Sequence, residues 1–163
     1  MAVHIVRLGT DRIKGEGLRI GTVRRPPRGV RKAEYASRNY YDLWLPALSP
    51  SAEAVTQAHS ARLDIEWQRF VRRYRREMAE PPARALLGLL AALSHQTDFS
   101  VGCYCANESR CHRSVLRELL REYGALVVPT PAADAPQAID ACTRSRAGAG
   151  SSSRRPGPPA SAR

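Results

Sequence analysis

Three cysteines and one histidine gather in a short stretch, CYCANESRCHR, and their side chains suit two kinds of chemistry. Cys103, Cys105, Cys111 and His112 offer three thiolates and one imidazole, a donor set that can enclose zinc tetrahedrally. A thiolate beside an imidazole can also act as a nucleophile with an acid/base partner, so Cys105 and His112 are candidate catalytic residues. In a third interpretation, Cys103 is a small hydrophobic residue on the buried face of a strand.

Two basic segments are candidate anion-binding sites. Arg113 lies at the beginning of a predicted helix, where free backbone N–H groups attract negative charge. The second segment, RRPPRGVRK, contains Arg24, Arg25 and Arg28 among prolines and a glycine that stiffen and turn the backbone. Planar guanidinium groups suit bidentate contact with phosphate, so these four arginines are the predicted phosphate-binding residues. A solvated surface loop is the alternative interpretation of the second segment.

The elements that must position these side chains are strands alternating with helices. Short β-branched stretches predict strands, and apolar residues spaced by three and four predict helices. The predicted strands cover residues 4–9, 18–25, 99–105 and 126–130. The predicted helices cover residues 50–59, 62–79 and 82–93, and a last helix begins near residues 110–113 and ends at Gly124. This alternation is typical of α/β domains. We therefore predict a single compact α/β domain over residues 1–130, with a small, partly parallel sheet and helices on both faces.

Both candidate segments follow a predicted strand. If those strands are parallel, both segments leave the sheet at its carboxyl edge, where ligand crevices form. The arginines of residues 24–28 are then expected to face Cys105, His112 and Arg113 across one pocket. Asp42, in YYDLWLP, is expected to border the same pocket as a candidate catalytic base.

The charge of the chain indicates its class of partner. Its 163 residues include 26 Lys and Arg against 15 Asp and Glu, a net charge of +11, so nucleotides or nucleic acid are the expected partners. Residues 131–163, rich in Ala, Ser, Gly and Pro, predict a disordered basic tail. We find no run of about eighteen apolar residues and no export signal, and we expect a cytoplasmic protein with reduced cysteines and no membrane contact.

The chain resembles a known family in four of its segments. These are RIGTVRRPPRGVRKAEY, YYDLWLPALSPS, the helix with Trp67, Phe70 and Tyr74, and CYCANESRCHRSVLRELL. Together they are similar to the YeaO-like family, domain of unknown function 488 (DUF488), over residues 3–128. The resemblance implies a compact α/β domain of bacterial, cytoplasmic type and supplies no established reaction. The doubled arginine at Arg24 and Arg25 departs from the aromatic-proline-arginine-glycine pattern that is more usual in this family.

Three hypotheses about function follow. In the first, the protein recognises a phosphate group in its pocket and is an enzyme that acts on nucleotides or nucleic acid. In the second, it is a non-catalytic nucleic-acid-binding module that uses the basic helix around Arg69–Arg76 and the tail, and its cysteines are structural. In the third, a structural zinc site made by the three cysteines and His112 holds the domain together.

Overall fold

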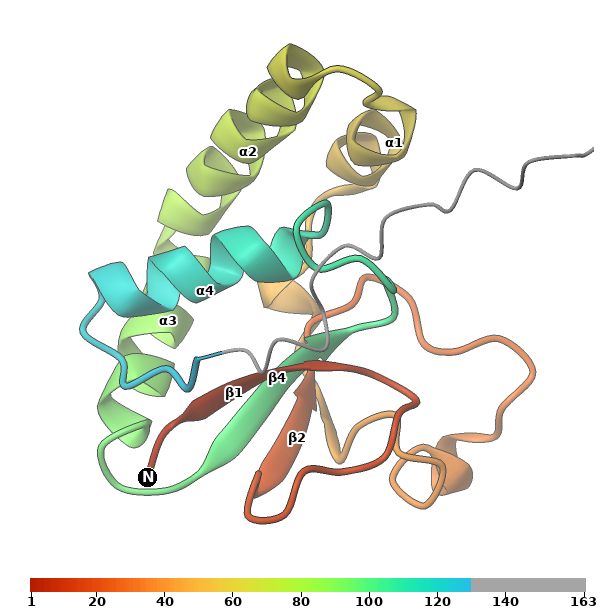
Figure 1. Cartoon of the computed structure of the whole chain (residues 1–163), viewed down its shortest axis with the longest axis vertical. Coiled ribbons are helices and arrows are strands. Elements are labelled where there is room, and N and C mark those ends of the chain that lie inside the picture. Colours follow the sequence, from red (N-terminus) through yellow and green to blue (C-terminus); the bar gives the residue numbers. More distant parts are fainter. Residues whose placement is uncertain (130–163) are drawn as a thin grey trace, which may run out of the picture.

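Four short strands form one sheet in which all neighbouring strands are parallel. The computed structural model describes residues 1–129, so the predicted tail at residues 131–163 lies outside the described residues. The strands are β1 (Val3–Arg7), β2 (Leu18–Gly21), β3 (Leu43–Trp44) and β4 (Phe99–Cys103), in the spatial order β1-β4-β2-β3. The sheet predicted to be partly parallel is thus fully parallel in the described part of the chain, and its strands all end at one edge (Figure 1).

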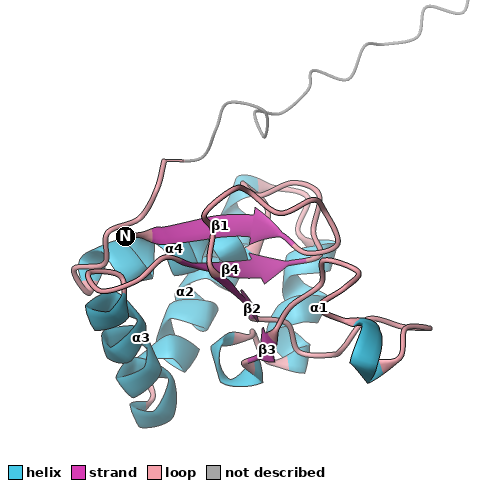
Figure 2. Ribbon diagram, turned by 90° about the horizontal axis from the view of Figure 1, so that it is seen from below, coloured by secondary structure: helices cyan, strands magenta, loops and turns pink. Residues whose placement is uncertain are grey.

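Four α-helices pack on one face of the sheet (Figure 2). They are α1 (Ala52–Ser60), α2 (Asp64–Ala79), α3 (Pro81–Leu93) and α4 (His112–Glu122). Side chains alternate along a strand, so Val3, Ile5, Phe99 and Val101 share the face that packs on these helices. None of the described helices combines the length and the apolar composition that crossing a bilayer requires.

The aromatic stripe of α2 lies in the core, as its spacing indicates. Trp67, Phe70, Tyr74 and Met78 are all buried, whereas the arginines of α2 lie on its other faces. The rings of Phe70 and Tyr74 stack with centroids 6.0 Å apart, and the Tyr74 hydroxyl donates to the carbonyl of Leu48 at 2.7 Å. The buried phenol therefore has a hydrogen-bond partner, which limits the cost of removing it from water.

The opposite face of the sheet is covered by loops, one of which contains η1 (Lys32–Glu34), a single turn of 3-10 helix without buried residues. The close approach requires glycine, because a Cβ on Gly21 would lie 2.4 Å from the ring of Tyr41. A Cβ on Gly102 would lie 2.5 Å from a side-chain methyl of Leu8. Both faces are thus covered, with the α-helices on one and loops on the other.

A loop without a helix connects β1 to β2, although these parallel strands lie on opposite sides of β4. Arg19 holds this crossover in place. Its buried guanidinium pairs with Glu16 at 2.7 and 2.9 Å and also donates to the carbonyls of Thr10, Asp11 and Asn39. All five N–H groups of the guanidinium are used, so this charge is fully compensated although it is 0% exposed.

Some predicted boundaries differ from the structure. The first helix begins after Ser51 and not at Ser49, because the hydroxyl of Ser51 accepts from the backbone N–H of Ala54. The strand predicted at residues 126–130 is, within the described residues, a single parallel bridge between Val3 and Val127. Helix α4 begins at His112, within the predicted region of residues 110–113, and ends before Gly124, which has φ +85°. Cys111 and His112 therefore both lie at the beginning of α4.

Candidate functional site

Loops that follow three parallel strands surround an open cavity at the carboxyl edge of the sheet. It has a volume of about 1110 Å³, and we call it the edge cavity. Residues 7–10 follow β1, residues 23–28 follow β2, and residues 103–105 end β4. The beginning of α4 and one side of α1 complete its lining. The structure thus places the two segments singled out in the sequence, the arginine loop and the cysteine segment, in one cavity.

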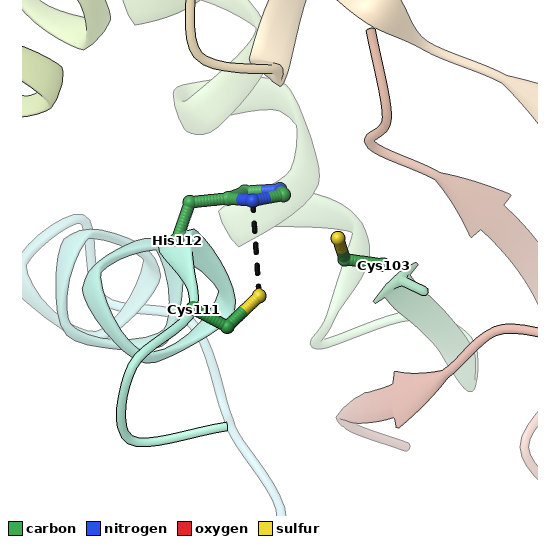
Figure 3. Close-up of side chains that lie close together, drawn as sticks. All are labelled: Cys103, Cys111 and His112. Atoms are coloured by element: carbon green, nitrogen blue, oxygen red, sulfur yellow. Dashed lines mark hydrogen bonds between the residues drawn. The ribbon is translucent and has the colours of Figure 1, made fainter. Parts of the chain in front are cut away.

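The sulfur and nitrogen atoms of the cysteine segment form a cluster inside this cavity. The Sγ atoms of Cys103 and Cys105 are 3.7 Å apart, and the Sγ of Cys111 is 3.8 Å from Nδ1 of His112. One donor atom each from Cys103, Cys111 and His112 lies within 4.8 Å of the others. Figure 3 shows Cys103 reaching this cluster from the end of β4, with Cys111 and His112 reaching it from the beginning of α4.

The loop between β4 and α4 brings these donors together. Cys111 donates its backbone N–H to the carbonyl of Glu108 at 3.0 Å, which closes a turn immediately before the helix. Arg113 donates from Nη2 to the carbonyl of Cys105 at 2.7 Å and so ties the far end of the loop to the first turn of α4. These two hydrogen bonds therefore bring residues that are distant along the loop together at the beginning of α4.

The backbone of Thr22, the residue after β2, holds His112 in one orientation. Its Nε2 lies 2.9 Å from the carbonyl oxygen of Thr22, so Nε2 carries a proton and donates it there. The unprotonated Nδ1 then faces the sulfur of Cys111. Burial lowers the pKa of His112 to about 4, so the imidazole is neutral at pH 7. A neutral imidazole with a fixed tautomer can accept a proton or ligate a metal through Nδ1.

Among the three thiols, Cys111 is the one whose ionised form is favoured. Side-chain contacts with Cys103 and Cys105, together with the attraction of the Arg113 guanidinium, hold the pKa of Cys111 well below its usual range. For Cys105, the hydrogen bond from Cys103 lowers the pKa, whereas the contact with Cys111 and burial raise it. The net effect is a raised pKa of Cys105. The lowered pKa expected at Cys105 is thus found at Cys111.

The arginine loop presents its charges to the cavity. Arg24, Arg25 and Arg28 are exposed and line it, and within the described residues none of the three forms an ion pair with a carboxylate. Arg24 has an electrostatic interaction with Glu53 of α1. Arg110 also lines the cavity but pairs with Asp64, and its guanidinium lies 5.7 Å from the centre of the Trp67 ring. Three unpaired cations therefore lie beside the thiol cluster.

Two of the predicted site residues are not in the cavity lining. Arg113 is 0% exposed, and its buried charge lowers the pKa of Cys111 without reaching the cavity. Its Nε and Nη1 have no hydrogen-bond partner among the described residues. Asp42 forms a bidentate ion pair with Arg12 at 2.7 and 2.9 Å and accepts from the backbone N–H of Arg19 at 2.8 Å. Asp42 precedes β3, so it lies toward the amino ends of the strands, away from the carboxyl edge.

Some cavity residues were not singled out in the sequence. Arg7 and His59 both line the edge cavity. Arg7 ends β1, so the rule that placed the other two segments at the carboxyl edge could also have placed Arg7 there. His59 comes from α1, and no local pattern indicates that this helix turns one side toward the sheet edge.

Two separations in the cluster agree with those around a tetrahedral metal ion. Among the described residues, the donors that all lie within 4.8 Å of one another are those of Cys103, Cys111 and His112, without Cys105. A zinc ion with Zn–S bonds of about 2.3 Å has neighbouring sulfurs about 3.8 Å apart. The separation of 3.7 Å between Cys103 and Cys105 agrees with such an edge, as does the separation of 3.8 Å between Cys111 and His112. The protein backbone also fixes the imidazole through Thr22, as a second ligand shell does at metal sites.

Comparison with known proteins gives one match. A family model, DUF488-N3a, described as the active DUF488-N3 subclade, matches residues 3–124. No curated protein matches the chain, and no solved structure matches it. The matched residues include the arginine loop, the whole cysteine segment and α4.

Proposed function

The chain belongs to the DUF488 family, and from this premise we propose that it is an enzyme that recognises the phosphate group of a nucleotide or nucleic acid in the edge cavity. One observation carries the proposal: Arg24, Arg25 and Arg28 line the same cavity as Cys105 and His112. The description of the matched subclade as active supports a catalytic role.

The arginine loop supplies the recognition. Exposed guanidinium groups without carboxylate partners within the described part of the chain are available to a phosphate. Pro26 and Pro27 restrict the backbone of this loop, which reduces the entropy lost when it binds. Hydrogen bonds from guanidinium to phosphate are charge-assisted and frequently bidentate. A phosphate held by this loop lies beside the thiol cluster.

The thiol cluster supplies the reactive groups. Cys105 is half-buried, whereas Cys103 and Cys111 are buried, so Cys105 is the thiol presented to a bound ligand. Cys105 interacts electrostatically with Cys111, and Cys111 lies beside Nδ1 of the neutral His112, so these two groups are the acceptors nearest to hand for its proton. Asp42 has no part in this proposal, since it pairs with Arg12 elsewhere.

The test measures ligand affinity by calorimetry, with a nucleoside 5′-monophosphate and a 5′-phosphorylated trinucleotide as probes. Replacing Arg25 and Arg28 together by alanine removes charge-assisted bonds worth about 1.5–3 kcal/mol each, so affinity should fall at least tenfold. The matched control replaces Arg31 and Arg38, which pair with Glu34 and do not line the cavity; its affinity should change less than threefold. Equal losses in the two variants, or no binding to the wild type, would overturn the proposal.

A second candidate function for the cluster is a zinc centre formed by Cys103, Cys105, Cys111 and His112. The sulfur and nitrogen separations in the cluster favour it. Charge supports it as well: three thiolates and Zn²⁺ sum to −1, and the buried guanidinium of Arg113 is a cation without partners for two of its nitrogens in the described chain. A buried charge needs such compensation.

Elemental analysis of the purified full-length chain tests the zinc centre. We expect one zinc per chain, loss of the metal in Cys111→Ser and His112→Ala, and retention in Cys142→Ser, whose thiol lies outside the described residues. A chelator should lower the unfolding temperature, because metal that binds only the folded state stabilises it. A metal-free wild type whose unfolding temperature does not change with added zinc would contradict this assignment.

A further inference from the structure

The outer side of α2 carries a second basic hollow, distinct from the edge cavity. It has a volume of about 650 Å³ and is lined by Gln57, Arg69, Arg72, Arg73, Arg75 and Arg76; we call it the arginine groove. No apolar side chain lines it. Since the apolar stripe of α2 is buried in the core, the helix presents mainly positive charge at this surface.

The five arginines of the groove are not equivalent. Arg75 forms a bidentate pair with Glu122 of α4 at 2.8 and 2.9 Å. Arg73 pairs with Glu77 at 3.3 Å and lies 3.7 Å from Glu53, which ties α2 to α1. These carboxylates are therefore already engaged by the arginines that hold the helices together.

The remaining arginines face solvent. Arg72 and Arg76 are exposed and have no ion pair among the described residues, and exposed Arg69 has only an electrostatic interaction with Glu66. These three positions follow one another at spacings of three and four, so they share one side of α2 and span about 10 Å along its axis. This length corresponds to about three phosphates of a nucleic-acid strand in helical geometry, at about 3.4 Å each.

Helix α1 lies between the arginine groove and the edge cavity. Gln57 lines the groove, whereas Val55, Thr56 and His59 of the same helix line the cavity. Glu53 interacts electrostatically with both Arg24 of the cavity and Arg73 of the groove. Figure 1 shows α1 beside α2, above the loops that end the strands. The two basic sites are thus neighbours separated by one short helix.

We propose that the arginine groove binds the phosphate backbone of a nucleic-acid strand, and that the strand continues over α1 so that one nucleotide reaches the edge cavity. This inference rests on the proposed function and narrows its substrate class from nucleotides to polynucleotides. A nucleic acid fits better than an anionic membrane, because surface-bound helices insert an apolar face into the lipid and α2 buries its own in the protein core.

The experiment measures binding of the full-length chain to a fluorescent single-stranded 20-mer at several salt concentrations. Reversing two charges, in Arg72→Glu/Arg76→Glu, should weaken binding at least tenfold and lower the slope of log affinity against log salt by about 1.4. The control, Lys14→Glu/Arg84→Glu, makes the same change in net charge at exposed residues outside both sites and should weaken binding less than threefold.

Three outcomes would overturn the inference: equal losses in the two variants, wild-type affinity in the groove variant, or binding to vesicles of anionic lipid without binding to the 20-mer. Affinity for the nucleoside monophosphate separates the two proposals. The variant Arg72→Glu/Arg76→Glu should keep the wild-type affinity for the monophosphate. Loss of binding to the 20-mer alone is therefore the result expected of the arginine groove. Failure of the wild type to bind the monophosphate would overturn the proposal for the edge cavity and not the one for the groove.

Discussion

The buried charge of Arg19 holds the β1–β2 connection to the sheet. Arg19 is completely buried, yet each of its five N–H groups finds an acceptor, two of them on Glu16 and three on loop carbonyls. A connection between parallel strands usually contains a helix that packs on the sheet. In the β1–β2 connection, the guanidinium of Arg19 replaces that packing by hydrogen-bonding the loop to the strand.

Removing this guanidinium should therefore be costly. Arg19→Met leaves the buried carboxylate of Glu16 with only the backbone N–H of Ile13 and a longer contact of 3.9 Å with Arg12 among the described residues. Loss of one partner of a buried pair costs about 3–5 kcal/mol in the free energy of unfolding. Urea denaturation measures this loss. The double variant Arg19→Met/Glu16→Leu should recover only part of it, because the loop carbonyls stay without their donor. Arg121→Met, which breaks an exposed pair with Glu118, should cost at most about 1 kcal/mol. A cost as small as this at Arg19 would contradict the assigned role.

Asp42 makes a separate prediction about pH. The guanidinium of Arg12 donates two hydrogen bonds to it, and these, with the backbone N–H of Arg19, hold the pKa of Asp42 below its usual range. Folding then favours the ionised carboxylate. The resulting stability is fully present above about pH 4, the usual pKa of an aspartate, and is lost as the pH falls through the lower folded value.

Asp42→Asn should accordingly lower the unfolding temperature at pH 7, and its difference from the wild type should shrink as the pH falls below 4. Thermal unfolding followed by circular dichroism over this range measures the difference. Asp11→Asn is the control, because the exposed side chain of Asp11 has no ion pair within residues 1–129. A difference that stays constant down to pH 2 would show that the carboxylate charge is not what stabilises this contact.

At the scale of elements, the entry of the crossover loop into β2 depends on Gly17. This residue has φ +64°, and a Cβ there would lie 1.9 Å from the carbonyl oxygen of Asp98, just before β4. Gly15, in the same loop, has φ +82° but open space around it. The pair separates the cost of backbone conformation from the cost of a steric clash.

Gly15→Ala should destabilise the protein by about 1–2 kcal/mol, the conformational cost of a positive φ at alanine. Gly17→Ala carries the same cost and must also separate β2 from the beginning of β4, so its unfolding temperature should be clearly the lower of the two. Differential scanning calorimetry of both variants measures this order. Equal unfolding temperatures would mean that β2 and β4 do not approach as closely as the structure has them.

The long elements could be predicted from the sequence because their apolar spacing reflects burial directly. The stripe from Trp67 to Met78 indicates both the helix and its buried face. Strand β3 could not be predicted in this way: it has only two residues, both exposed, and depends on pairing with β2. Once β3 is known to begin at Leu43, Asp42 lies at the amino edge of the sheet, away from the cavity.

The candidate site could be predicted in part for a similar reason. Residues that follow strands gather at the carboxyl edge of a parallel sheet, which brings the arginine loop to the cysteine segment. The distribution of protons within the cluster could not be predicted. Which thiol is ionised depends on which sulfur accepts hydrogen bonds and on the buried Arg113, and neither follows from the spacing of the cysteines.

Considered as a whole, the molecule uses its many arginines in three ways. Arg19 and Arg113 are buried and hold loops to the sheet and to α4. Arg73 and Arg75 connect helices through carboxylates. Arg24, Arg25 and Arg28 at the edge cavity, and Arg72 and Arg76 along the arginine groove, have no ion pair in the described chain and lie on the two sides of α1. This distribution agrees with a ligand that carries several phosphates.

The central claim is that the arginine loop and the cysteine segment bind one ligand together. Titration of the ¹⁵N-labelled chain with a nucleoside 5′-monophosphate, followed by amide NMR shifts, tests it most directly. We expect the amides of Arg24, Arg25 and Arg28 and those of residues 104–111 to shift along one common binding curve. The amides of residues 11–17, near the amino ends of the strands, should stay unchanged. Shifts confined to one of the two segments, or two different dissociation constants, would contradict the account.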